Sequence, residues 1–546
     1  MNNIIKDNFF YIDSTNIKDV KDSLYGFYIV KRNNEIKLIS SLKNEVFNKD
    51  EILNGQYIYV KRTDNGINIF VDDFSSFYIY YYEDNDFYAL SNSFYILLEN
   101  LKKKNKKLTF DKIIADEYVQ CSYRSYAVYD TLINEIKVVP IFTDLLLNEK
   151  INFIEKEYNI DSVDILSKEG IDIIDNWINK YASIIHALSK TKYHIQVDLS
   201  GGFDSRVIFS LINYSNINWN NDNIHVFSKV GENKGTIKHL SNDFEIAYKI
   251  ASKLGLNIIS KDNYNIKAIR YSGQQEYDIL KNCFMGVHKE GYFCVKNYNE
   301  PLIHFGGVNG EIIRRSIENL EIIKKQYLCA NPIKNSQEVY DKLQLDFDNM
   351  CKSSKTNNEA LLKMYIGTLG KNHFGMSIFN GFLGNSFLLS PFNDKELLKL
   401  HTPKEFNKNL VFALIIYRTT PEIFDIEFTN NKKFDDNIIE VVKTISEKYQ
   451  INKNINETYS IYVDNAYLYK YDKETDGLNG NDVLYNTFLE NKELFISKYG
   501  EFFNKDYAEK IYDYANDFYL NKDNFFRNKW INCLTSIIEV FKIIYQ

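Results

Sequence analysis

The clearest pattern of apolar and polar positions in this chain is a strand followed at once by a helix. Residues Tyr193–Leu199 alternate in polarity and end on an apolar residue, as a buried β-strand does. Two glycines follow, and apolar residues then recur at helical spacing at Val207, Ile208, Leu211 and Ile212. The pattern predicts a strand, a tight turn and a helix, the repeating unit of an α/β domain.

The same alternation continues beyond this unit. A second strand is predicted at Ile224–Ser228, and the residues from Ser241 to Leu254 form a helix with an apolar stripe that stops at Gly255. A later strand begins at Leu302 and runs into a glycine-rich turn. These segments together favour a sheet of parallel strands connected by helices.

The first part of the chain has a different pattern. From Tyr25 to about Leu101, aromatic and β-branched runs alternate with polar turns, which indicates a β-rich region. Residues 102–175 are predicted as a linker and a helical entry into a second domain, and residues 435–546 carry helical patterns. The candidate strands of the β-rich region are Gln56–Lys61, Gly66–Asp72, Phe77–Tyr82 and Phe87–Leu90.

Composition narrows the class of protein. A chain of 546 residues suits two or three domains with large cores. Six cysteines without CxxC spacing argue against a disulfide framework and against a zinc site. A net charge of −7 provides no basic surface for nucleic acid, and no signal pattern or apolar run of membrane length is present. We therefore expect a cytoplasmic protein without nucleic-acid or membrane partners.

The turn after the first predicted strand carries the candidate chemistry. Glycines at 201 and 202 let the backbone approach a ligand closely, and a turn before a helix directs N–H groups at one point, which suits phosphate. Ser200 and Ser205 add hydroxyl donors, whereas Asp204 requires a cation such as magnesium between itself and a phosphate. The spacing fits neither the Walker loop nor the dinucleotide fingerprint. An ordinary strand-to-helix turn is the alternative interpretation.

This Ser-Gly-Gly-x-Asp-Ser string resembles the pyrophosphatase loop of the asparagine synthetase family. The second strand and its Asp/Glu-led helix resemble the family's next elements. The resemblance implies that ATP is cleaved to AMP and pyrophosphate while a carboxylate becomes an acyl-adenylate, which an amine or ammonia then attacks. It implies contacts to ATP from Leu199, Ser200, Gly201, Gly202, Asp204 and Ser205, and from Val226 to the adenine.

A third matching segment is Leu302–Glu311, which resembles the family's strand and acidic turn. The resemblance assigns Gly306 and Gly307 to nucleotide binding and makes Glu311 a candidate for catalysis and for magnesium, together with Asp204. The match is incomplete, because Gly307 and Gly310 stand where the family carries a glutamate and an aspartate. A solvated surface acid is the alternative interpretation of Glu311.

Two later segments extend the resemblance. Residues 389–394 are similar to a family segment that packs under the active site, and we expect a structural role for them. Asn430–Phe434 resembles the stretch with the pyrophosphate-binding lysine, which makes Lys432 a candidate catalytic residue and Lys433 the reserve. A lysine there would stabilise the charge on departing pyrophosphate. An exposed basic turn is the alternative.

The β-rich first part resembles the amidotransferase domain that precedes the synthetase domain in this family, on residues 71–81 and 89–93. Active members begin with a catalytic cysteine directly after the initiator methionine. Asn2 stands there in this chain, and the first cysteine is Cys121. Because an amide cannot form the thioester that glutamine hydrolysis needs, we predict that glutaminase activity is absent.

The expected fold class is therefore α/β with a β-rich N-terminal domain. Residues 1–150 are expected to form a degenerate amidotransferase-like layered sheet domain. Residues 160–434 are expected to form a doubly wound parallel-sheet ATP-pyrophosphatase domain, with residues 435–546 as its helical C-terminal extension.

The expected function is that of an ATP- and Mg²⁺-dependent amide ligase, with a small-molecule, glycan or peptide carboxylate and an amine or ammonia as reactants. Three alternatives stay open. One is sugar amidation or amidination in bacterial glycan synthesis, another is thiolation, and the third is a non-catalytic nucleotide-binding member of the family. A homodimer is also left open.

Overall fold

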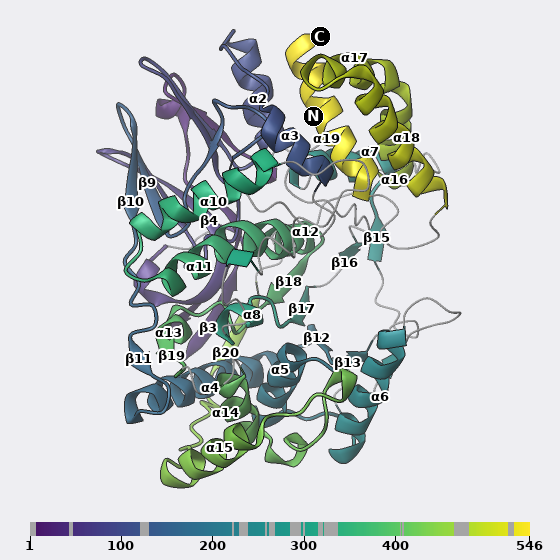
Figure 1. Cartoon of the computed structure of the whole chain (residues 1–546). Helices are drawn as coiled ribbons and strands as arrows, with labels where there is room; N and C mark the ends of the chain where they lie inside the picture. Colours follow the sequence, from purple (N-terminus) through teal and green to yellow (C-terminus); the bar gives the residue numbers. More distant parts are fainter. Residues whose placement is uncertain are drawn as a thin grey trace.

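The computed structural model is a mixed α/β protein with several separate sheets and many helices (Figure 1). Within the described ranges, no helix is both long enough and apolar enough to cross a bilayer. The described residues are 7–42, 47–120, 130–220, 223–228, 238–256, 259–260, 268–283, 296–298, 301–314, 320–321, 337–403, 406, 409–463, 480–521 and 529–546.

One sheet has five strands, all parallel, in the spatial order β14-β13-β12-β17-β18. The next strands in the sequence, β13 and β14, lie on one side of β12, and the later strands β17 and β18 lie on its other side. The direction of winding therefore reverses between β12 and β17. In open α/β sheets, ligands bind at the carboxyl ends of the strands at such a reversal. The three strands predicted from periodicity are confirmed. The strands are β12 (His194–Asp198), β13 (Ile224–Ser228), β14 (Ile259–Ser260), β17 (Leu302–Phe305) and β18 (Ser386–Leu389).

A group of helices lies together on one side of this sheet (Figure 1). Helix α5 is the helix predicted after the glycine turn, and all its residues from Arg206 to Ile212 are buried. It packs against α4 and α14, and α15 packs against α14. Burial around the whole circumference is typical of helices in the centre of a layer. These helices are α4 (Lys168–Ser189), α5 (Phe203–Tyr214), α6 (Lys238–Lys253), α14 (Leu410–Thr419) and α15 (Asp436–Lys448).

A seven-stranded mixed sheet occupies the N-terminal part, in the order β10-β9-β5-β4-β2-β3-β20. The predicted strands at 56–61 and 66–72 are confirmed as parts of β4 and β5. Two expectations are wrong: residues 143–155 form strands β9 and β10 rather than a linker, and β20, from the segment expected to be helical, pairs in parallel with β3. The strands are β2 (Ser23–Arg32), β3 (Glu35–Ile39), β4 (Ile52–Thr63), β5 (Gly66–Val71), β9 (Thr143–Leu147), β10 (Ile151–Glu155) and β20 (Ser460–Val463).

A four-stranded antiparallel sheet, in the order β1-β7-β6-β8, lies in the same part of the chain. The C-terminal helices pack against α2 and α3 of this part and against α7. For example, the Tyr95 hydroxyl donates to the Ser536 carbonyl at 2.7 Å. The elements are β1 (Tyr11–Asp13), β6 (Tyr80–Glu83), β7 (Tyr88–Ser91), β8 (Lys137–Val138), α2 (Phe94–Lys103), α3 (Lys112–Gln120), α7 (Gly273–Cys283), α16 (Gly480–Glu490), α17 (Lys492–Phe502), α18 (Lys505–Asn521) and α19 (Lys529–Tyr545).

Helix α12 contacts both strand β2 of the N-terminal sheet and strand β18, and helix α10 packs against α3 and α11 (Figure 1). Between α11 and α12 the chain forms a π-helix, η4, over Ile366–Gly375. The remaining elements are α8 (Gly310–Ile313), α10 (Gln337–Lys352), α11 (Asn357–Tyr365), α12 (Met376–Leu383), α13 (Lys395–Leu398), the 3₁₀ turns η1 (Ile17–Asp19), η2 (Lys49–Glu51), η5 (Pro421–Ile423) and η6 (Thr429–Asn431), and the paired short strands β11 (Val163–Asp164) with β19 (Leu400–His401) and β15 (Ala268–Arg270) with β16 (Lys296–Tyr298).

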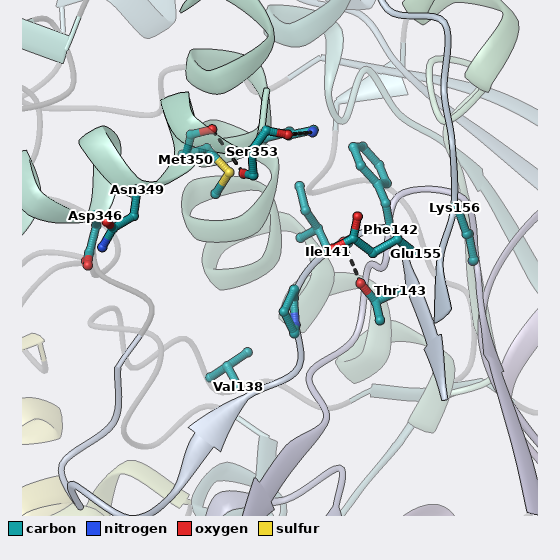
Figure 2. A pocket seen from close by; sticks show the side chains of 12 residues that line it. Val138, Ile141, Phe142, Thr143, Glu155, Lys156, Asp346, Asn349, Met350 and Ser353 are labelled. Carbon is teal, nitrogen blue, oxygen red and sulfur yellow. Dashed lines mark hydrogen bonds between the residues drawn. The ribbon is translucent and has the colours of Figure 1, made fainter. Parts of the chain in front are cut away.

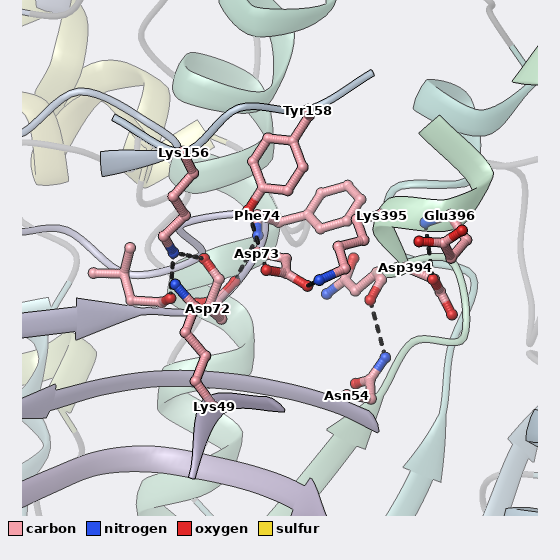
Figure 3. A network of polar contacts seen from close by, with 12 residues as sticks. Lys49, Asn54, Asp72, Asp73, Phe74, Lys156, Tyr158, Asp394, Lys395 and Glu396 are labelled. Carbon is pink, nitrogen blue, oxygen red and sulfur yellow. Dashed lines mark hydrogen bonds and ion pairs between the residues drawn. The ribbon is translucent and has the colours of Figure 1, made fainter. Parts of the chain in front are cut away.

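A polar network joins the N-terminal sheet to the segment after β18 (Figure 3). The Lys156 ammonium donates to the Val71 carbonyl at 2.6 Å, and the Tyr158 hydroxyl donates to Asp73 Oδ1 at 3.1 Å. On the other side, the Asn54 amide donates to the Asn393 carbonyl at 3.0 Å. Because one continuous apolar core also runs through both parts, the two halves of the chain are packed together rather than tethered.

Two fully buried charged groups lie near this junction. Burial raises the pKa of Asp72 to about 6, although hydrogen bonds from Ser76 and Phe74 and the charge of Lys156 act against the rise. Burial lowers the pKa of Lys371, on η4, to about 8, and the negative charge of Asp72 only partly offsets this. The Lys371 ammonium lies 5.2 Å from the centre of the Tyr78 ring. In the described part of the chain, no carboxylate forms an ion pair with it.

We expect Lys371→Met to stabilise the protein at pH 7. The pKa of Lys371 is lower in the folded than in the unfolded state, so the unfolded chain binds more protons between about pH 8 and pH 10, and wild-type stability rises with pH there. The substitution should add roughly 2–3 kcal/mol to the free energy of unfolding at pH 7 and flatten that rise. Calorimetry at pH 7 and pH 9.5 measures both, with the exposed Lys505→Met as control. Equal pH dependence in both variants would contradict the assignment.

Candidate active site

The two predicted turns meet at the reversal of the parallel sheet. The Ser-Gly-Gly turn, residues 200–205, connects β12 to α5, and the acidic turn, residues 306–311, connects β17 to α8. Their strands are neighbours in register, with Val197 opposite Phe305. The carboxyl ends of parallel strands lie at the same edge, so the fold brings together residues separated by about a hundred positions in sequence.

The Ser-Gly-Gly turn is closed by its own hydroxyl groups. The Ser200 N–H donates to Ser205 Oγ at 3.1 Å, and the two serine hydroxyl oxygens are 2.8 Å apart. The Gly202 N–H donates to Ser200 Oγ at 3.2 Å. Leu199, which precedes the turn, is buried and donates to the Phe227 carbonyl at 2.7 Å. Two N–H groups and both hydroxyls of the predicted phosphate site are therefore bonded to one another within a single turn.

Gly201 lies where three parts of the chain make close contact. Its carbonyl accepts from the Thr429 N–H at 2.9 Å, and the Thr429 hydroxyl donates to Asp243 of α6. A Cβ at position 201 would overlap the Thr429 hydroxyl and lie 2.8 Å from Asp243 Oδ1. Glycine is required there because of this close approach rather than because of an unusual backbone angle.

Arg206 supports the turn in a way that sequence reasoning missed. Its side chain is fully buried, stacks on Phe428 at 3.6 Å, and donates to the carbonyls of Ile426 and Glu427, the latter at 2.6 Å. Burial lowers the pKa of Arg206 to about 9. The sequence signal for its burial is the position of an arginine inside an apolar helix stripe. Its partners could not be predicted, because they lie more than two hundred residues away.

The glycines of the acidic turn give space to Asp204. A Cβ at Gly310 would overlap Asp204 Oδ1, and one at Gly307 would lie 2.7 Å from Asp204 Cβ. Any larger residue at these two positions would therefore displace the Asp204 side chain. The two glycines of this turn thus have a local steric reason in this chain.

The electrostatics around Asp204 suit a cation. Its Oδ1 atom is buried and has no hydrogen-bond partner among the residues that the structure describes, and its Oδ2 lies 3.6 Å from Arg314 Nη2. Burial raises the pKa of Asp204, the negative charge of Glu311 raises it further, and Arg314 lowers it. An unsatisfied carboxylate oxygen beside a second carboxylate costs free energy unless a proton or a cation compensates for the charge.

Glu311 is half-buried on α8 and lies close enough to Asp204 to act on its pKa. Within the described ranges, no three acidic, histidine or cysteine side chains form a cage for a metal. Mg²⁺ needs no such cage, since it is commonly held by one or two carboxylates together with substrate phosphates and water. Asp204 and Glu311 therefore fit the predicted magnesium site.

Gly306 and Val226, which are also predicted to contact the nucleotide, offer it only backbone groups. Gly306 donates to the Leu389 carbonyl at 3.1 Å, and a Cβ there would lie 2.9 Å from Leu388 Cδ1. Val226 is in the middle of β13 opposite Val197, and its side chain is buried. Only the backbone of Val226 is therefore suited to the predicted adenine contact.

Lys432 and Lys433 follow a tight turn in which the Phe428 N–H donates to the Lys432 carbonyl at 2.8 Å. Both lysine side chains are exposed. Thr429 of the same turn contacts Gly201, so the fold brings the backbone of this basic turn to the Ser-Gly-Gly turn. A role for either ammonium group stays a prediction.

The segment at 389–394 supports the acidic turn from behind, as expected. The Ser390 hydroxyl donates to the Val308 carbonyl at 2.5 Å, and the Asn309 amide donates to Asn393 Oδ1 at 2.6 Å. Asn309 has a positive φ of 65° and precedes α8. Asn2 and Cys121, on which the predicted loss of glutaminase activity depends, lie outside the described residues.

A separate cavity of about 370 Å³ lies between β8–β10 and helices α10 and α11 (Figure 2). Apolar side chains such as Phe142 and Met350 line it together with several charged groups. The charged groups already have partners: Lys156 pairs with Asp144 at 3.0 Å and Asp346 with Lys342 at 2.5 Å. None of the residues predicted for nucleotide binding lines this cavity.

We expect Gly310→Ala to destabilise the protein by displacing the Asp204 carboxylate. Overpacking of this kind typically costs about 1–3 kcal/mol. The double variant Gly310→Ala/Asp204→Ala should recover most of the loss, because the overlapping atom is gone. Thermal unfolding of the single and double variants measures the coupling. Gly370→Ala, whose new Cβ would be 3.5 Å from its nearest neighbour, is the control. Additive effects of the two substitutions would contradict the contact.

Arg206→Lys should weaken the attachment of residues 426–429 to α5. A lysine cannot donate to two carbonyls in the fixed geometry of a guanidinium, and each lost hydrogen bond to a charged group is worth about 1.5–3 kcal/mol. Urea unfolding compares this variant with Arg62→Lys, at an exposed donor to the Lys18 carbonyl. A midpoint unchanged in both variants would show that Arg206 does not hold this segment.

Comparison with models of known protein families finds no match for this chain, and comparison with curated protein sequences finds none either. The features that favour a nucleotide site are the residues of the two turns, the meeting of these turns at one edge of the sheet, and the Asp204 carboxylate. The resemblance to the asparagine synthetase family rests on the motifs quoted above.

Proposed function

We propose that this chain is an ATP-dependent amide ligase that releases AMP and pyrophosphate, similar to asparagine synthetase but without its own glutaminase. The observation that carries the proposal is the buried, unpartnered Asp204 oxygen, which lies beside a Ser-Gly-Gly turn at the reversal of a parallel sheet. That combination supplies phosphate donors and a carboxylate for a cation at one place.

The proposal includes the finer organisation of the fold. Residues 160–434 form a doubly wound ATP-pyrophosphatase domain, and residues 1–150 form a degenerate amidotransferase-like domain. The sheet order β14-β13-β12-β17-β18 supports the first assignment. The C-terminal residues 435–546 belong to both domains, because their strand β20 pairs with β3 of the N-terminal sheet while the rest adds helices. A cytoplasmic location is part of the proposal.

In the proposed binding mode, the turn from Ser200 to Ser205 holds the triphosphate through its backbone N–H groups and hydroxyls. The backbone of Val226 contacts adenine, and the backbone of Gly306 and Gly307 contacts the nucleotide at the carboxyl end of β17. Asp204 and Glu311 would hold magnesium, which neutralises charge on the phosphate oxygens when bound. Arg314, 3.6 Å from Asp204, limits the net negative charge of the site.

The proposed reaction has two steps. A carboxylate oxygen of the acid attacks the α-phosphorus of ATP, and the bond to the β-phosphate oxygen breaks as pyrophosphate leaves. Lys432 stabilises the charge that the leaving group gains. An amine nitrogen then attacks the acyl carbon, and AMP leaves with the electrons of the acyl–oxygen bond. The acid is an amino acid, a sugar acid or a peptide.

A second candidate is a nucleotide-binding protein without turnover. Two observations favour it. The Ser200 and Ser205 hydroxyls bond to each other, and the acidic turn has glycines at 307 and 310, with the Asp204 side chain in the space that acidic side chains there would need. In this candidate, ATP binds but no pyrophosphate is released with any carboxylate. Sugar amidation or amidination remains a third reaction on the same nucleotide loop.

Pyrophosphate release from Mg-ATP tests the proposal. A panel of amino-acid, sugar-acid and peptide carboxylates is supplied with and without ammonia, and one acid should stimulate release in the wild type. Asp204→Ala should abolish the stimulated rate, and Lys432→Ala should lower it by about 10²-fold. Asp172→Ala, at an exposed helix pair with Lys168, is the matched control. Glutamine should not replace ammonia.

Nucleotide binding separates the outcomes of this experiment. Release that is stimulated by an acid and lost in Asp204→Ala supports the ligase. Binding of ATP without release by any acid favours the nucleotide-binding candidate. No binding of ATP by the wild type would contradict both.

A further inference from the structure

One face of the parallel sheet carries an unusual group of polar side chains. Along β12, the half-buried His194, Gln196 and Asp198 alternate with the buried Ile195 and Val197. Because side chains alternate between the two faces of a strand, the three polar residues share one face. The sequence predicts the strand, but none of the motifs described above includes these three residues.

The neighbouring strands extend the polar face. Gln196 is opposite His225 of β13 on one side and opposite His304 of β17 on the other. Residues in register on parallel strands point to the same face, so the polar group spans three adjacent strands. It ends at β18, where Leu388 is opposite His304. We define the polar face as His194, Gln196, Asp198, His225 and His304.

Polar residues at these positions need an explanation. Parallel sheets are normally covered on both faces and carry apolar residues on each. Here the side chains of Asp198 and His304 are 47% and 23% exposed, respectively. They are the last and next-to-last residues of their strands, so they lie at the edge where the Ser-Gly-Gly turn and the acidic turn begin.

Three side chains of the polar face are arranged as a base with its supports. The His304 Nε2 lies 2.7 Å from Asp198 Oδ2, and the Gln196 amide donates to Asp198 Oδ1 at 2.8 Å. An ionised carboxylate can only accept a hydrogen bond, so the ring carries a proton on Nε2, and Nδ1 is the nitrogen that holds the lone pair in the neutral ring. Among the described residues, Nδ1 has no hydrogen-bond partner.

The other two histidines are engaged with each other. His194 Nδ1 lies 3.2 Å from His225 Nε2, a hydrogen bond in which one ring donates to the other. The arrangement of His304 is therefore distinct: it has an orienting carboxylate on one nitrogen and an available lone pair on the other. A base held by a carboxylate in this way is the arrangement that enzymes use for proton abstraction.

We propose that His304, oriented by Asp198 and Gln196, is the base that accepts the proton of the attacking amine; this inference rests on the proposed ligase function. The amine nitrogen forms a bond to the acyl carbon while the bond between that carbon and the AMP oxygen breaks. AMP leaves with the electron pair, and the proton of the nitrogen passes to His304 Nδ1. Asp198 and Gln196 act as positioning residues.

The test compares two nucleophiles with the acid that stimulates the wild type most strongly. Hydroxylamine is a strong nucleophile that traps acyl-adenylates without an enzymic base, whereas the nitrogen of ammonia, which attacks as NH3, must pass a proton to a base as the amide forms. His304→Asn should therefore keep hydroxamate formation within a few-fold of wild type. It should lose about 10²-fold or more of the ammonia-dependent amide formation. Asp198→Asn should show the same selective loss of ammonia-dependent amide formation as His304→Asn, but by a smaller factor.

Controls separate the outcomes. His401→Asn, on β19, should change neither rate, and His304→Gln provides a second variant if His304→Asn folds poorly. Equal losses with both nucleophiles, or no loss with either, in a folded His304 variant would overturn the assignment while leaving the ligase intact. A wild type that forms no hydroxamate with any acid would instead overturn the proposed function itself.

Discussion

The close approach of Asp204 to the acidic turn is the constraint on which the rest of the site depends. The Asp204 side chain fills the space that side chains at Gly307 and Gly310 would occupy, so α5 and the start of α8 lie within van der Waals distance. Gly201 meets Thr429 and Asp243 equally closely on the other side of the turn. Glycines at these places allow three separate segments to converge on the carboxyl ends of β12 and β17. Without them the turns would be forced apart.

This convergence buries charged groups that a simple core would exclude. Asp204 retains an unsatisfied oxygen, and Arg206, two residues further along α5, is buried with its guanidinium bonded only to carbonyls and stacked on Phe428. A buried charge is tolerated where hydrogen bonds or a counter-ion offset its desolvation. Two nitrogens of the Arg206 guanidinium donate to carbonyls, although its Nε has no partner among the described residues. Asp204 has Arg314 at 3.6 Å as its opposite charge, and in the proposed function a bound cation would offset the remaining negative charge.

A single strand serves both the fold and the chemistry. One face of β12 supplies Ile195 and Val197 to the core, the other face supplies Gln196 and Asp198 to the polar face, and its end leads into the Ser-Gly-Gly turn. The N-terminal sheets pack against the same half of the molecule through Asn54 and through one continuous core. A substitution in this junction can therefore change the conformation of the acidic turn, because Asn393 contacts Asn309 in that turn.

The sequence by itself determined the local elements. Periodicity located β12, β13 and β17 and the helices that follow the first two of these strands, because alternation of polar and apolar residues reports which face of an element is buried. It also located the turn chemistry, since glycines, serines and an aspartate have conformational and hydrogen-bonding properties of their own. Only the tertiary structure decided the partners. Strand β20 completes a sheet begun more than four hundred residues earlier, and β9 and β10 join it from a segment that lacked a clear strand pattern. The contacts of Gly310 with Asp204 and of His304 with Asp198 likewise join distant positions. Burial patterns record that a residue is covered, but not by which residue, and that choice arises only when the whole chain packs.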